Sequence, residues 1–86
     1  MRHARGADLD RIETLLLRLR RLPGLKEKSR GTFYRGARAF LHFHEHDGAI
    51  LADVRLADEF ERFPATSAAE QKTLLGLLAA ALKGEG

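Results

Sequence analysis

The chain has 86 residues, no cysteine and a formal net charge of +3, with eleven Lys and Arg against four Asp and Glu in residues 1–38 and four against eight in residues 39–86. A chain of this length forms one small domain held by a hydrophobic core, and the lack of cysteine excludes disulfides, thiolate metal sites and cysteine nucleophiles. The first residues lack the apolar segment of a secretory signal, and no apolar run approaches the roughly 18 residues of a membrane span, so we expect a cytoplasmic protein without membrane contact.

An amphipathic helix is predicted near the N-terminus, after residues 1–7, which we expect to be disordered. Its apolar positions recur at steps of three and four residues: Leu9, Ile12, Leu15, Leu16, Leu19 and Leu22. Asp8 or Asp10 can cap the start of this helix. Pro23-Gly24 ends it, because proline cannot continue a helix and glycine favours the turn that follows.

Three segments with alternating apolar residues come next, at residues 31–35, 37–45 and 48–56. Alternation with a period of two predicts β-strands. Asp47-Gly48, between the last two segments, indicates a two-residue type I′ turn, which needs positive φ at both central positions. We therefore expect an antiparallel hairpin with His46 opposite Ala49.

This hairpin register assigns each side chain to a face of the sheet, and it places His42 opposite Asp53. One face is continuous and apolar, and it carries Ala39, Leu41, Phe43, Ile50, Ala52, Val54 and Leu56. The opposite face carries Phe40, His42, His44, Leu51, Asp53 and Arg55. If the turn before Arg38 has two or four residues, Phe33 joins Phe40 on that second face. A slip by one residue would send the histidines into the core, so the pattern and the turn favour the same register.

A second helix is predicted over residues 68–83, with Ser67 and Glu70 as a capping box at its start. Its apolar stripe consists of Leu74, Leu75, Leu78 and Leu82. Residues 57–65, before this helix, fit either a helical turn or a further strand. The whole pattern predicts an α+β fold: a single two-layer α-β-β-β-α domain over residues 1–86. Its antiparallel meander has three strands, or four if residues 57–65 form one, with the N- and C-terminal helices packed on one face.

The histidines form the most suggestive pattern. Side chains at positions i and i+2 of a strand lie roughly 6.5–7 Å apart on one side, so His42 and His44 could share a zinc ion at Zn–N distances of about 2.0–2.1 Å. Asp53 could be a third ligand or a carboxylate that orients an imidazole, and His46 could be a fourth ligand. The alternative is that these polar residues only stabilise cross-strand pairs.

A catalytic interpretation of the same residues is weaker. His42 with Asp53 could be a general base with its orienting carboxylate. The nearby hydroxyl candidates are Ser29, Thr32 and Tyr34, and the last two are predicted on the opposite face. The chain has no Gly-rich phosphate loop and no nucleophile elbow. We therefore favour a non-catalytic protein.

The second face also presents aromatic rings beside arginines. Phe33 and Phe40 near Arg38 and Arg55 could stack nucleic-acid bases, form a homodimer or protein interface, or be covered by residues 57–65. The basic residues of the first half could support nucleic-acid binding, or they could be the solvated side of the first helix. The expected ligand- or partner-binding residues are Phe33, Arg38, Phe40, His42, His44, Asp53 and Arg55.

The segment LPGLKEKSRGTFYRGARAFLHFHEHDGAILADVRL, residues 22–56, resembles the MmcQ/YjbR-like proteins, small bacterial domains with a Leu-Pro-Gly-like turn, a Gly-containing hairpin and an aromatic-rich strand. It is also similar to short bacterial proteins labelled luciferase-domain, whose Phe-x-His-x-His-like and Asp-x-Arg-Leu-like strands correspond to residues 40–44 and 53–56. The resemblance implies a two-layer α+β domain and no established catalytic residue, and nucleic-acid binding is commonly attributed to the first family. We expect a non-catalytic binding module that uses the exposed sheet face, with nucleic-acid binding or divalent-metal binding as alternatives.

Overall fold

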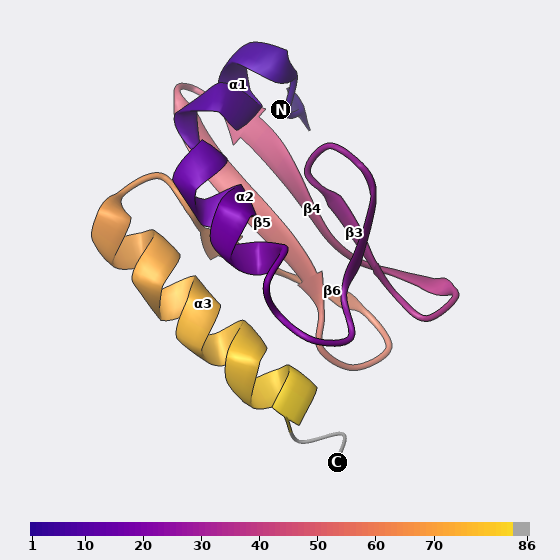
Figure 1. The fold of residues 1–86 in the computed structure, drawn as a ribbon. Helices are drawn as coiled ribbons and strands as arrows, with labels where there is room; N and C mark the ends of the chain where they lie inside the picture. Colours follow the sequence, from indigo (N-terminus) through magenta and orange to yellow (C-terminus); the bar gives the residue numbers. More distant parts are fainter. Residues whose placement is uncertain (84–86) are drawn as a thin grey trace.

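The centre of the sheet is the hairpin of strands β4 (Arg38–His46) and β5 (Ala49–Arg55), in a computed structural model that describes residues 1–83 (Figure 1). The connecting residues have positive φ, at 50° for Asp47 and 85° for Gly48. The observed pairs run without a break from His46 opposite Ala49 to Leu41 opposite Val54. The register predicted from the turn is therefore confirmed.

The described residues form one six-stranded antiparallel sheet, which is larger than the predicted meander. Besides β4 and β5, it contains the predicted first strand, β3 (Thr32–Arg35), and the possible fourth, β6 (Phe60–Pro64); β1 (Arg2–His3) and β2 (Lys26–Ser29) were not predicted. Five of the six strands follow the order β2-β3-β4-β5-β6, and β1 pairs with the end of β4 that β3 does not reach. The antiparallel α+β architecture is confirmed, while the strand count exceeds three or four.

One segment differs from expectation and one open alternative is decided. Residues 1–7, expected to be disordered, contain β1, in which Arg2 and His3 pair with Glu45 and His44 of β4. Residues 57–65, which fitted a strand or a helical turn, contain the strand β6 beside β5. Proline at the end of β6 is compatible with an edge strand, because proline has no N–H to donate and an edge strand has one side without a neighbouring strand.

The helices lie on one face of the sheet, where α2 and α3 run side by side (Figure 1). The predicted first helix is divided at Ile12 into α1 (Gly6–Arg11) and α2 (Glu13–Leu19), because Ile12 leaves the helical region at φ −116° and ψ 21°. The last helix, α3 (Ala68–Lys83), has the predicted bounds. None of the helices in residues 1–83 combines the length and apolarity needed to cross a membrane.

The capping box of α3 is confirmed: the Glu70 backbone N–H donates to Ser67 Oγ at 3.1 Å, and the Ser67 N–H donates to Glu70 Oε1 at 3.0 Å. The core between the layers joins the helical leucines to the predicted apolar sheet face. Its most deeply buried members include Leu15, Leu16, Leu19, Leu41, Ile50, Ala52, Val54, Leu74 and Leu78. Burial of this apolar surface is the main stabilising contribution to the fold.

The expectation that Phe33 and Phe40 lie exposed beside the histidines is wrong. Tyr34 pairs with Ala39, but Phe33 pairs with Leu41, so Phe40 is an extra residue in β4 relative to β3. This irregularity is a β-bulge, and beyond it the alternation of the two strands is offset by one residue. Phe33 therefore lies on the core side with 1% of its surface exposed, and Phe40 is also in the core cluster with 3% exposed.

Candidate functional site

The candidate site lies on the sheet face opposite the core, where four strands contribute to one cluster. Strand β4 supplies His42 and His44, and β5 supplies Asp53 directly across from His42. The edge strand β6 places Arg62 opposite Asp53, and β1 places His3 opposite His44. We call these five residues the histidine cluster.

The carboxylate of Asp53 is the centre of the histidine cluster. The Nε2 atoms of His44 and His42 lie 2.9 Å and 3.5 Å from Asp53 Oδ2. Arg62 donates from Nε to Oδ1 at 2.8 Å and from Nη2 to Oδ2 at 3.0 Å. Asp53 is buried, with 6% of its surface exposed, and these partners satisfy both carboxylate oxygens. Hydrogen bonding of this kind is what a buried charge requires.

The surroundings of Asp53 keep it ionised. Burial by itself would raise the pKa of its carboxyl group, but the hydrogen bonds and charge of Arg62, together with His44 and His42, hold that pKa below the ordinary value. For His42, burial lowers the pKa of the imidazole, and His44, His3 and Arg62 act in the same direction against the opposing effect of Asp53. The lowered pKa favours a neutral His42 ring near neutral pH, and a neutral ring is the form that binds a metal ion.

Three imidazole rings lie close together in the cluster. The ring centroids of His42 and His44 are 4.9 Å apart, and the exposed His3 ring lies 4.7 Å from His44 and 5.8 Å from His42. Sequence reasoning missed His3, because its two-residue strand has no pattern. It also missed Arg62, because the ambiguity of residues 57–65 left the pairing of β6 with β5 unpredicted.

His46, expected as a fourth metal ligand, is outside the cluster. Its side chain is half exposed, at 51%, and its Nε2 atom lies 3.3 Å from Asp47 Oδ2 at the hairpin turn. Although it shares the parity of His42 and His44, its position at the end of the strand turns its ring to a local partner. Among residues 1–83, the group of donors able to hold one metal ion consists of His42, His44 and Asp53.

Phe60 of β6 covers one side of the cluster. Its ring centroid lies 4.8 Å from that of His42, edge to face. The Phe60 ring also contacts Arg55, whose Cζ lies 4.5 Å from the ring centroid in a cation–π arrangement. Arg55 also donates from Nε to the carbonyl oxygen of Ala39 at 3.0 Å. The segment that includes β6 therefore covers His42 rather than the buried phenylalanines.

The remaining predicted binding residues divide between two places. Phe33 is in the core, whereas Arg38, Phe40 and Arg55 line a separate hollow at the opposite end of β4 from the β4–β5 turn. The expected hydroxyl candidates do not approach the cluster: in the described part of the chain, no Ser, Thr or Tyr hydroxyl bonds to His42, His44 or Asp53. The structure thus joins His42, His44 and Asp53, with Arg55 nearby through Phe60.

The spacing of the donor atoms suits a metal ion. The contributing atoms of His42, His44 and Asp53 all lie within 4.8 Å of one another. Tetrahedral zinc with bonds of about 2.0–2.1 Å needs ligand atoms roughly 3.3 Å apart, close to the 3.5 Å between His42 Nε2 and Asp53 Oδ2. The shorter His44–Asp53 distance is that of a hydrogen bond, which a metal would replace with a small separation of the two groups.

Comparisons with known proteins find no match: no protein-family model fits the chain, and no curated protein or solved structure is significantly similar to it. The resemblance of residues 22–56 to the two bacterial families therefore stays a prediction.

Proposed function

We propose that this domain is a binding module whose ligand is a divalent transition-metal ion such as zinc, bound on the exposed sheet face by His42, His44 and Asp53. One observation carries the proposal: the Nε2 atoms of both imidazoles approach the same oxygen, Asp53 Oδ2, at 3.5 and 2.9 Å. The donor atoms of these three residues lie within 4.8 Å of one another, as the ligands of a single metal ion do. Cross-strand stabilisation alone does not require a second histidine at that oxygen.

The donor set favours zinc or a similar ion over magnesium or calcium. Two imidazole nitrogens and one carboxylate oxygen are ligands typical of zinc, whereas the harder ions prefer oxygen ligands alone. The His42 and His44 side chains keep 23% and 13% of their surface exposed, so an ion can reach them from solvent. A fourth position could be taken by His3 or by water, which would leave the coordination open to a further ligand.

Arg62 fits a supporting role at such a site. Carboxylates that bind metals are commonly held by a second hydrogen-bond donor. Arg62 donates to both oxygens of Asp53, from Nε to Oδ1 and from Nη2 to Oδ2, and the histidines approach Oδ2. Metal binding would exchange the His44–Asp53 contact for two coordinate bonds and could leave the Nε–Oδ1 hydrogen bond in place. The guanidinium charge also opposes a cation, so we expect moderate rather than extreme affinity.

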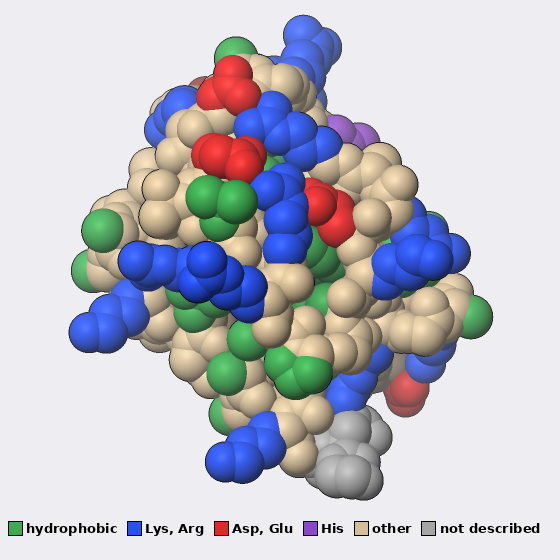
Figure 2. Space-filling view, viewed as in Figure 1, with side chains coloured by type: hydrophobic (Ala, Val, Ile, Leu, Met, Phe, Trp, Pro, Cys, Tyr) green, Lys and Arg blue, Asp and Glu red, His purple; other side chains and the backbone are tan. Residues whose placement is uncertain are grey.

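Nucleic-acid binding through the basic N-terminal half is less supported. Arg2 pairs with Asp8, and Arg20 and Arg30 both pair with Glu13. Figure 2 shows Lys and Arg side chains spread over the helix-bearing face with acidic groups among them, not collected in one stripe. A continuous basic surface is the usual electrostatic footprint of a nucleic-acid-binding protein.

The test is calorimetric titration of zinc into the wild-type chain and into His42→Ala, His44→Ala and His46→Ala variants, with thermal melts to check folding. We expect one zinc ion per wild-type chain, with binding at least about tenfold weaker in the first two variants, since each lacks one ligand. His46→Ala is the matched control, because it removes a histidine of the same strand outside the donor group. Wild-type binding that responds equally to all three variants, or that is absent, contradicts the proposal.

A further inference from the structure

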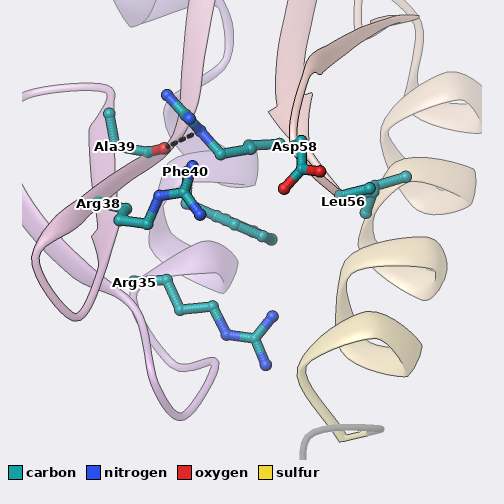
Figure 3. A pocket seen from close by; sticks show the side chains of 8 residues that line it. Arg35, Arg38, Ala39, Phe40, Leu56 and Asp58 are labelled. Carbon is teal, nitrogen blue, oxygen red and sulfur yellow. Dashed lines mark hydrogen bonds between the residues drawn. The ribbon is translucent and has the colours of Figure 1, made fainter.

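We propose that a second site on this domain, independent of the metal site, binds the phosphate group of a small phosphorylated molecule. The site is a hollow of about 430 Å³ lined by Arg35, Arg38, Phe40, Arg55 and Asp58 among others (Figure 3). It opens between the β3–β4 hairpin and the loop that follows β5. Its volume falls in the usual range of small-molecule sites, roughly 300–1,000 Å³.

The charge of the hollow favours an anion. Three guanidinium groups line it against the single carboxylate of Asp58. Arginine presents a planar set of donors that matches phosphate oxygens, and charge-assisted hydrogen bonds to phosphate are among the strong ones. Elsewhere in the described chain, Arg2, Arg20, Arg30 and Arg62 form ion pairs with carboxylates. Arg38 forms no ion pair with any of the described residues, so its charge is available to a ligand.

The β3–β4 hairpin brings two of these charges together. Arg35 and Arg38 are directly opposed across the strands, joined by Gly36 and Ala37. Directly opposed residues of an antiparallel pair lie on the same side of the sheet, so an anion beside this hairpin can contact both guanidinium groups. In Figure 3 both side chains extend to the same side of the hairpin, toward the space beside the Phe40 ring.

The site is partly preorganised by fixed neighbours. Arg55 is held by its hydrogen bond to the Ala39 carbonyl and by the Phe60 ring. The buried Phe40 ring, displaced by the β-bulge, lines the hollow, and Arg35 Cζ lies 5.7 Å from its centroid. Groups that are already ordered lose little conformational entropy when a ligand binds. Leu56, beside Asp58, adds apolar surface that an organic group attached to the phosphate could contact.

The experiment titrates metal-free protein in chloride buffer with inorganic phosphate and with phenyl phosphate, following amide signals by NMR. We expect saturable shifts at residues 35–40 and 55–58, with Arg38→Gln about tenfold weaker, since one charge-assisted bond of roughly 1.5 kcal/mol is lost. Arg21→Gln is the matched control, because Arg21 is an exposed arginine outside the hollow. We expect it to bind like the wild type, and Asp58→Asn to bind several-fold more tightly because a repelling charge is removed.

Tighter binding of phenyl phosphate than of inorganic phosphate would assign the site to organic phosphate monoesters, and equal binding would assign it to the phosphate group itself. Unsaturable shifts, or equal weakening by Arg38→Gln and Arg21→Gln, would overturn the proposal. A third result would also overturn it: a 12-nucleotide DNA strand binds more tightly than the monoester, and Arg38→Gln and Arg21→Gln weaken that binding equally. Such binding would be general attraction of a polyanion to the basic surface. His42→Ala is expected to leave phosphate binding unchanged, which separates this site from the metal site.

Discussion

His44 Nε2 lies 2.9 Å from Asp53 Oδ2, across the two central strands of the sheet. The two residues are not directly opposed, since His42 is the cross-strand partner of Asp53 and His44 pairs with Leu51. The contact is therefore a diagonal one, and it places two imidazoles on one carboxylate. A carboxylate shared in this way, with Arg62 at its other oxygen, links the register of the hairpin to the chemistry of the exposed face.

Replacing Asp53 with asparagine tests that link. The amide cannot accept the same pair of charge-assisted hydrogen bonds from Arg62, so we expect Asp53→Asn to lower the free energy of unfolding by about 1–2 kcal/mol at neutral pH and to abolish zinc binding. Urea unfolding and calorimetry measure the two effects. Asp58→Asn, an exposed loop position, is the control and should change neither. Full zinc affinity in Asp53→Asn would remove the carboxylate from the proposed site.

Replacing His3 tests whether the N-terminal strand supplies a metal ligand. Its ring lies 4.7 Å from that of His44, so it is a candidate donor for a fourth coordination position. We expect His3→Ala to weaken zinc binding by about threefold to tenfold, less than the loss of either central histidine. Affinity identical to that of the wild type would leave water as the fourth ligand.

Gly31 is needed for backbone conformation and for close packing. It has a φ of +81°, and a Cβ there would lie 2.7 Å from Leu9 Cδ2. We expect Gly31→Ala to lower the free energy of unfolding by at least about 1–2 kcal/mol, because the left-handed region is unfavourable for alanine. Gly76→Ala is the matched control: Gly76 lies in α3 with no atom near its Cβ position. That change should raise the free energy of unfolding by about 0.5–1 kcal/mol. Urea unfolding measures both variants, and a Gly31→Ala variant more stable than Gly76→Ala would contradict this role of Gly31.

Glu27 makes stability depend on pH. Burial would raise the pKa of its carboxyl group, but hydrogen bonds from Arg20 and from the Gly31 N–H, with the charge of Arg20, hold that pKa below the ordinary value. A carboxyl whose pKa is lower in the folded state stabilises the fold above the unfolded pKa, and this contribution is lost as the pH falls through the folded pKa. Glu27→Gln should therefore be less stable than the wild type at about pH 7, with the difference shrinking toward about pH 3. Urea unfolding across that range checks it, and a difference independent of pH would mean that the charge of Glu27 is not responsible.

The sequence was most informative where local chemistry determines structure. Asp47-Gly48 predicted the register of the central hairpin, and Ser67 with Glu70 predicted the start of α3, because each depends on a few neighbouring residues. The pairing of His42 with Asp53 followed from that register.

The parts that sequence reasoning missed depend on contacts between distant segments. The β-bulge at Phe40 becomes visible only when β4 is paired with β3. The edge strand β1 is too short and polar to show a pattern, so His3 could not be assigned to the cluster. Arg62 was hidden for a related reason, since its role depends on β6 pairing with β5.

The most direct test of the metal site is a zinc titration of the wild-type chain, following the imidazole nitrogen signals of all four histidines by NMR near neutral pH. We predict saturation at one zinc per chain, with the largest changes at Nε2 of His42 and His44 and little change at His46. Small, unsaturated changes shared by all four rings, or no change at His42 and His44, would contradict it.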